Sequence, residues 1–82
     1  MIILDGKKMG GRDELHAHLK ERFAFPDYYG ANLDALNDCL GERGERELVV
    51  ISDAGAFLED CGPYGARLLK VFSDNGIQVL LD

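Results

Sequence analysis

The sequence has little cysteine and no long apolar run. Its two cysteines, Cys39 and Cys61, form neither a disulfide framework nor the closely spaced pattern of a zinc or redox site. A membrane-spanning helix needs about 18 consecutive apolar residues, and no stretch approaches that length. The apolar opening of residues 1–4 is too short for a signal peptide, and Lys7 and Lys8 follow it instead of preceding it. We therefore expect a soluble domain in the reducing environment of the cytoplasm.

Basic residues are scarce in most of the chain. Of the 82 residues, 15 are acidic and 9 are Lys or Arg, which gives a formal net charge of −6. Residues 23–42, 47–66 and 71–82 contain no Lys or Arg. Direct binding of nucleic acid is disfavoured, because it requires cations that displace the counterions of the phosphates. A one-signed surface attracts oppositely charged partners, although the net charge by itself speaks first for solubility.

The length and the hydrophobic periodicity predict a single α/β domain over residues 1–82. Apolar runs predict strands at residues 1–4, 47–52 and 77–81, and the β-branched run of the middle strand is typical of one that is covered on both faces. Residues 42–46 are predicted to form a solvated loop. Four helical patterns separate the strands. Between the first and second strands, one has Leu15, Leu19 and Phe23 on its apolar side, and the next runs from Asn32 to Leu40 and is ended by Gly41. Between the second and third strands, one is capped by Asp53 and ends near Asp60, and the last runs from Pro63 to Asn75.

Strands that are separated by helices pair in parallel through crossover connections. Right-handed crossovers that place their helices on one face give the strand order 1-2-3, which we prefer. An order with the first strand in the centre requires helices on both faces, and the apolar runs do not exclude it. The expected fold is a small three-stranded parallel sheet packed with three to four helices.

The predicted helix from Asn32 to Leu40 carries two aspartates opposite its apolar face. At 100° per residue its three leucines lie on one side, whereas Asp34 and Asp38 lie on the other. Like charges four residues apart destabilise a helix by roughly 0.2–0.5 kcal/mol. Asp38 also lies near the predicted carboxyl end, where the helix dipole disfavours an anion. A local conflict of this kind is typical of functional sites, although exposed aspartates are also an ordinary polar face.

Two adjacent tyrosines precede this helix. In an extended segment successive side chains point to opposite sides, so Tyr28 and Tyr29 cannot both be buried. One of them can fill the core beside Pro26 while the other is presented outward. Tyrosine offers a large, stiff contact surface with a polar tip, and it is enriched in protein interfaces. An exposed tyrosine beside paired carboxylates indicates a binding face.

One segment carries a pattern with many fixed positions: Pro26-x-Tyr28-Tyr29-Gly30-x-Asn32-Leu33-Asp34-Ala35-Leu36-x-Asp38-Cys39-Leu40. Together with Leu15-His16 in the first helix and Val71-Phe72 in the last, it resembles the barstar family, the intracellular inhibitors of barnase-type secreted ribonucleases. The resemblance covers nearly the whole chain. The expected order of strand, helix, helix, strand, helix, helix, strand agrees with it.

The resemblance implies an inhibitor that closes a nuclease active site with its second helix and the preceding loop. Asp38 would take the place of an RNA phosphate against the arginines and the catalytic histidine of the nuclease, Tyr28 would pack on that histidine, and Asp34 would meet further cations. Gly30 and Asn32 would shape the loop. The implied protein is not an enzyme, needs no cofactor or metal, is a monomer when free, and binds a basic ribonuclease of the barnase class.

Three positions depart from the pattern of the family. Asn37 stands where tryptophan is common, and Arg43 stands near the place of an aromatic residue after the helix. A cation that faces a basic nuclease would be unfavourable. Asp74 is the loosely aligned counterpart of an acidic residue that family members also use in their last helix. These departures leave the centre of the implied site intact and put the identity of the nuclease in doubt.

The sequence lacks the residue combinations that enzymatic functions require. A hydrolase needs a nucleophile with a base, a phosphate loop or a metal cluster. His16 and His18 point in different directions on a helix, and we expect each at the surface or packed at an edge. Cys39 is expected to be a small buried hydrophobe, and Asp34 with Asp38 is a poor Mg²⁺ site because such ligands usually come from several elements. The alternative that stays open is an interaction module of the same fold that binds another basic partner or self-associates.

Overall fold

The computed structural model describes residues 1–43 and 47–82. Three parallel strands form an open sheet in the order β1-β2-β3: β1 (Ile2–Asp5), β2 (Leu48–Ser52) and β3 (Gln78–Leu81). The register pairs Ile3 with Val50 and Val50 with Leu80. The predicted α/β class and the preferred strand order are thus confirmed.

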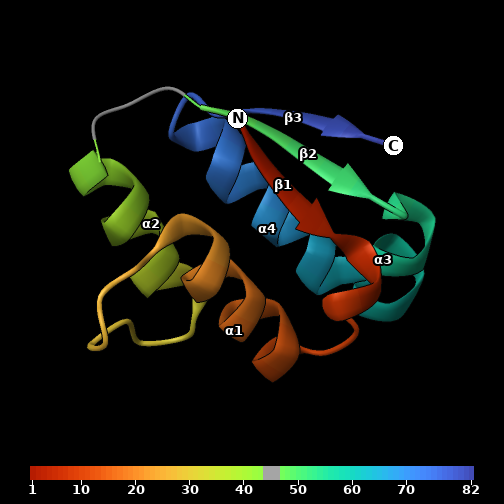
Figure 1. Ribbon diagram of the computed structural model, residues 1–82, viewed down its shortest axis with the longest axis horizontal. Coiled ribbons are helices and arrows are strands. Elements are labelled where there is room, and N and C mark those ends of the chain that lie inside the picture. The colour runs from red at the N-terminus through yellow and green to blue at the C-terminus, as the bar shows by residue number, and fades with distance from the viewer. Residues whose placement is uncertain (44–46) are drawn as a thin grey trace.

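The helices lie in the two crossover connections. Between β1 and β2 are the short 3-10 helix η1 (Gly6–Lys8), α1 (Arg12–Phe23) and α2 (Leu33–Arg43); between β2 and β3 are α3 (Ala54–Cys61) and α4 (Pro63–Asp74). In Figure 1, α4 passes behind the sheet and α1 lies beside β1, while α2 is near the ends at which the strands begin and α3 is near the ends at which they finish. No helix among residues 1–43 and 47–82 is long and apolar enough to cross a membrane.

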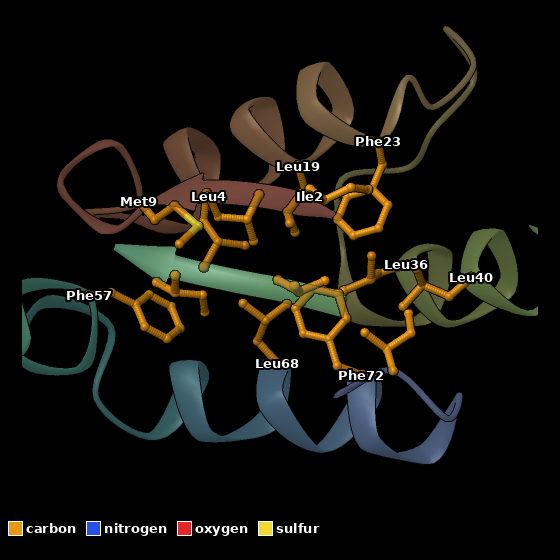
Figure 2. Packing of buried hydrophobic residues seen from close by; sticks show 14 of the residues in the cluster. Ile2, Leu4, Met9, Leu19, Phe23, Leu36, Leu40, Phe57, Leu68 and Phe72 are labelled. Atoms are coloured by element: carbon orange, nitrogen blue, oxygen red, sulfur yellow. The ribbon is translucent and has the colours of Figure 1, made fainter. Parts of the chain in front are cut away.

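The core lies between the inner face of the sheet and the helices. Every second strand residue points inward, because side chains alternate along a strand. Figure 2 shows these inward residues meeting side chains of α1, α2, α3 and α4, among them Phe57 of α3. The buried set includes Ile2, Leu4, Val49 and Ile51 of the sheet, Leu19 and Phe23 of α1, Leu36 and Leu40 of α2, and Leu68 and Phe72 of α4.

The outer face of the sheet carries no covering layer in the described residues, so the prediction that β2 is covered on both faces was wrong. Ile3 and Leu80 are 46% and 47% exposed, and Val50 between them is half-buried. Neighbouring strands are about 4.8 Å apart. The three apolar side chains therefore shield one another in a row across the sheet, which explains the apolar run of β2 without a second layer of helices.

The prediction that Gly41 ends the second helix was wrong, because α2 continues to Arg43. The Arg43 Nη1 group donates a hydrogen bond to the Phe23 carbonyl at 2.8 Å, and the guanidinium lies 5.2 Å from the centroid of the Phe23 ring. Its other terminal nitrogen pairs with Glu47. The contacts of Arg43 with Phe23 and Glu47 hold the last turn, although a glycine often ends a helix. Glu42 and Arg43, which were predicted to lie in a loop, are therefore helical, and residues 44–46 of that predicted loop lie outside the described residues.

The other helix ends follow the sequence more closely. Helix α1 ends before Pro26, where Ala24 adopts a left-handed conformation with φ of 55° and the Phe25 N–H donates to the Lys20 carbonyl at 3.0 Å. Helix α4 begins with a proline, as predicted. The prediction that Asp53 caps α3 was wrong, because its side chain accepts no hydrogen bond from the described backbone of that helix. The Asp53 carboxylate instead lies 3.8 Å from Lys7 Nζ.

Candidate functional site

The two adjacent tyrosines divide between solvent and core, as predicted. Tyr28 is 79% exposed, whereas Tyr29 is 9% exposed and its ring centroid lies 4.8 Å from that of Phe25. The Tyr29 hydroxyl lies 2.6 Å from Nδ1 of the buried His16. Burial raises the pKa of Tyr29, so its hydroxyl keeps its proton and stays able to donate or accept. Tyr28 thus projects from a loop whose next residue is anchored in the core.

Asn32 joins this loop to α2. Its Oδ1 atom accepts a hydrogen bond from the Ala35 N–H at 2.7 Å, which caps the amino end of the helix, and its Nδ2 group donates to the Gly30 carbonyl at 3.2 Å. A Cβ atom at Gly30 would lie 3.2 Å from the Cβ of Ala35, closer than most real contacts. The absence of a side chain at Gly30 therefore lets the loop approach the first turn of α2. Ala31 completes the turn with φ of 52°.

A pocket of about 270 Å³ opens between the loop and α2. It is lined by Tyr28, Tyr29, Gly30, Ala35, Asp38, Cys39 and Glu42. Two carboxylates thus face the same space as an exposed aromatic ring. The pocket is suited to a cationic or planar polar side chain of a partner, because carboxylates bind such groups through charge-assisted hydrogen bonds.

Cys39 forms one wall of this pocket. It is half-buried and packs against the core, so it is more accessible than the buried hydrophobe that the sequence predicted. Burial raises the pKa of the Cys39 thiol, and the nearby carboxylates of Glu42 and Asp38 raise it further. The thiol is therefore protonated at neutral pH and is a weak nucleophile.

The acidic residues of α2 form a row along one side of the helix. Asp34, Asp38 and Glu42 are all exposed and follow one another at intervals of four residues, a spacing that places side chains on one helix face. Sequence reasoning missed Glu42 because it ended the helix at Leu40. The spacing of four residues from Asp38 was the signal that could have found it. Asp34 lies one turn before Asp38 and does not line the pocket among the described residues.

Asp74 is the predicted site residue that lies outside the loop and α2, and it does not line the pocket. It is in the last turn of α4, where its carboxylate is 3.0 Å from Lys70 Nζ. The following residue, Asn75, donates a hydrogen bond to Asn37 Oδ1 at 2.8 Å. Asn37, which stands where the family commonly has tryptophan, therefore ties α2 to the end of α4.

Arg43 does not project as an unpaired cation toward a partner. Its guanidinium is half-buried between the end of α1, through Phe23, and Glu47. The expectation that Arg43 lies in a solvated loop was wrong, because the contacts that extend α2 also turn this side chain inward. The charge that it adds to the sequence is locally balanced by a carboxylate.

Both histidines are buried, so the expectation of surface or edge positions was wrong. His16 is 1% exposed and lies between two tyrosine hydroxyls, each 2.6 Å from one of its ring nitrogens, those of Tyr29 and Tyr64. His18 accepts a hydrogen bond from the Asp5 N–H through Nε2 at 2.9 Å. Burial lowers the pKa of both rings. Within the part of the chain that the structure describes, no group of three or more His, Cys, Asp or Glu side chains could hold a metal ion.

Comparison with known proteins identifies the family to which the chain belongs. The profile of the family described as Barstar (barnase inhibitor) matches residues 1–79. The chain belongs to the barstar family. A curated protein of Bacillus subtilis (strain 168), named "Putative ribonuclease inhibitor YrdF", is 56% identical to it over 74 residues, which are 89% of this chain and 81% of that relative. Membership of the barstar family supports a role as a ribonuclease inhibitor and a ribonuclease as partner.

Proposed function

We propose that this protein inhibits a basic ribonuclease of the barnase class by covering its active site with α2 and the Tyr28 loop. The observation that carries the proposal is the pocket in which Asp38 and Glu42 face the exposed Tyr28. Membership of the barstar family supports the choice of a ribonuclease. In this proposal the protein acts by binding alone, without catalysis, cofactor or metal, and is a monomer before it binds.

The chemistry of inhibition is mimicry of a phosphate. The active site of a ribonuclease presents cations to the RNA backbone, and a carboxylate accepts two parallel hydrogen bonds from an arginine as a phosphate does. Asp38 and Glu42 both line the pocket beside the exposed tyrosine, and Asp38 is the one that the resemblance to the barstar family assigns to the place of the phosphate. Tyr28 supplies a rigid ring that can pack on a side chain of the nuclease while its hydroxyl stays hydrated. Asp34 and Glu42 extend the acidic surface by one turn on each side.

The charge distribution favours rapid association with a basic partner. The formal net charge is −6, and residues 23–42, which contain the loop and most of α2, have no Lys or Arg. A surface of one sign raises the rate at which oppositely charged proteins meet, and salt reduces this effect. In the proposed complex, Asp74 contributes only at the edge of the surface, because Lys70 already balances its charge.

An inhibition assay with purified barnase-class ribonuclease tests the proposal, and Asp38→Asn is the decisive variant. Hydrogen bonds to charged groups contribute about 1.5–3 kcal/mol, so removing the charge should raise the inhibition constant about 10- to 150-fold. The matched control is Glu59→Gln, because Glu59 is an exposed carboxylate on α3, at the opposite end of the strands from α2. We expect the control to change inhibition less than twofold, and Tyr28→Ala and Asp34→Ala to follow Asp38→Asn in size.

Two results would contradict different parts of the proposal. Equal inhibition by wild-type protein and Asp38→Asn would show that the inhibitory centre lies elsewhere. Full nuclease activity in the presence of excess wild-type protein would exclude ribonucleases of this class as the target. The second result would favour an interaction module of the same fold with another basic partner or with itself.

A further inference from the structure

His16 connects three segments that are far apart in the sequence. It lies in α1, Tyr29 lies in the loop 13 residues later, and Tyr64 lies 48 residues later in the first turn of α4. The distance from Nδ1 to the Tyr29 hydroxyl and the distance from Nε2 to the Tyr64 hydroxyl are both 2.6 Å. A neutral imidazole has one N–H donor and one lone pair, so in either tautomer one hydroxyl accepts and the other donates. The three side chains therefore form a continuous hydrogen-bonded chain.

Both ends of this chain are held by packing. At one end the Tyr29 ring contacts Phe25, with centroids 4.8 Å apart. At the other end the Arg12 guanidinium lies 4.3 Å from the centroid of the Tyr64 ring. The ring of His16 itself is tilted against Tyr29 and meets Tyr64 edge to face. Neither tyrosine can move far without breaking its hydrogen bond to His16.

The exposed part of the proposed site begins one residue from this hydrogen-bonded chain. Tyr28 is 79% exposed, so its own side chain does little to hold the loop in place. The position of Tyr28 is set by the backbone on either side of it. The Tyr29 N–H donates a hydrogen bond to the Pro26 carbonyl at 3.0 Å and closes a turn that contains Tyr28. Whatever fixes Tyr29 therefore also fixes the direction in which Tyr28 projects.

We propose that His16 is a positioning residue for partner recognition, which acts through the Tyr29–His16–Tyr64 chain to hold the Tyr28 loop in its binding geometry. This inference rests on the proposed function, since it assigns a role in the same binding site. A loop that is already ordered loses less conformational entropy when a partner binds. Tyr64 tests the idea well because it lines a separate pocket with Arg12 and Arg67 and does not line the Tyr28 pocket.

The first test measures the loop in the free protein. Tyr64→Phe removes one hydroxyl and keeps the ring, and Ile51→Val is the matched control because it trims the core of β2 and touches none of these hydrogen bonds. Amide hydrogen exchange of residues 24–32 should become about two- to tenfold faster in Tyr64→Phe than in wild-type protein. Exchange in β2 should change much less than in the loop. If loop and β2 amides accelerate equally in Tyr64→Phe, as we expect for Ile51→Val, the chain stabilises the fold as a whole and the positioning role is refuted.

The second test measures binding to a catalytically inactivated ribonuclease of the barnase class. Tyr64→Phe should weaken affinity about two- to tenfold, but less than twofold when Tyr28 is already replaced by alanine, because loop geometry then has no ring to present. Equal losses in both backgrounds would refute the positioning role. If the wild-type protein does not bind this nuclease, the proposed function fails, and the exchange measurement still decides whether His16 orders the loop.

Discussion

Asn32 allows two contributions to the loop to be separated by substitution. Its Oδ1 atom caps α2 through the Ala35 N–H at 2.7 Å, and its Nδ2 group holds the Gly30 carbonyl at 3.2 Å. Asn32→Ala removes both contacts. Asn32→Asp keeps an acceptor for the cap and loses only the donor to Gly30. We expect the two variants to differ clearly in stability although they change the same position.

The magnitudes follow from the two hydrogen bonds. Replacing a capping asparagine by alanine costs about 1 kcal/mol, and the exposed contact with Gly30 adds about 0.5 kcal/mol. Asn32→Ala should therefore lower the free energy of unfolding by about 1.5 kcal/mol, which in a domain of this size corresponds to a Tm lower by about 6–12 °C. In Asn32→Asp, the loss of the donor is offset by a favourable anion at the amino end of the helix. Its Tm should change by less than about 4 °C.

Thermal and urea denaturation at pH 7 and low salt measure both variants, with Asn37→Ala as the control. Asn37 is on the same helix and makes a single side-chain hydrogen bond, to Asn75 at 2.8 Å, without capping the helix. Asn37→Ala should lower the free energy of unfolding less than Asn32→Ala does. The reasoning is refuted if Asn32→Asp is as destabilised as Asn32→Ala, because the cap would then contribute nothing that a carboxylate can replace.

Two further predictions concern charge. Glu42→Gln should weaken nuclease inhibition by up to about fivefold and reduce its salt dependence, because Glu42 is exposed and solvent screens its charge, and Glu59→Gln should leave both unchanged. The free energy of unfolding should also decrease when the pH is lowered. Burial lowers the pKa of His16 and His18 below 6.5 in the folded state. The stability is therefore fully present above about pH 6.5 and is lost as the pH falls toward the folded pKa values. Urea titrations from pH 7.5 to 5.0 measure this slope. The slope should be shallower in His18→Gln, which keeps an acceptor for the Asp5 N–H and does not titrate.

Local patterns predicted the parts of the fold that depend on neighbouring residues. The strand order follows from apolar runs separated by helices, since parallel strands need crossovers of one hand. The division of Tyr28 and Tyr29 between solvent and core follows from the alternation of side chains in an extended segment. The roles of Asp34 and Asp38 stay predictions, because their geometry on α2 is compatible with binding but does not by itself identify a partner.

Contacts between distant residues account for what the sequence did not predict. Helix α2 continues past Gly41 because Arg43 reaches Phe23, 20 residues earlier, and this contact has no local signature. The same turn brings Glu42 into the pocket. His16 looked like a surface residue because its two hydroxyl partners are 13 and 48 residues away. Polar groups that are satisfied only in the folded chain give no periodic pattern, so hydrophobic periodicity could not reveal them.

The loop and the acidic row are positioned by separate contacts, and this has a consequence for recognition. Tyr29 is fixed from α1 and α4 through His16, whereas Gly30 is fixed from α2 through Asn32. Because Asn32 also caps α2, its side chain connects the helix that carries Asp38 to the loop that carries Tyr28. Ordering a loop on binding costs conformational entropy, and the contacts of Asn32 reduce that cost because they already hold the backbone of the loop against the first turn of α2. The contributions of Tyr28 and Asp38 to affinity should therefore depend on each other, since loosening these contacts moves one relative to the other.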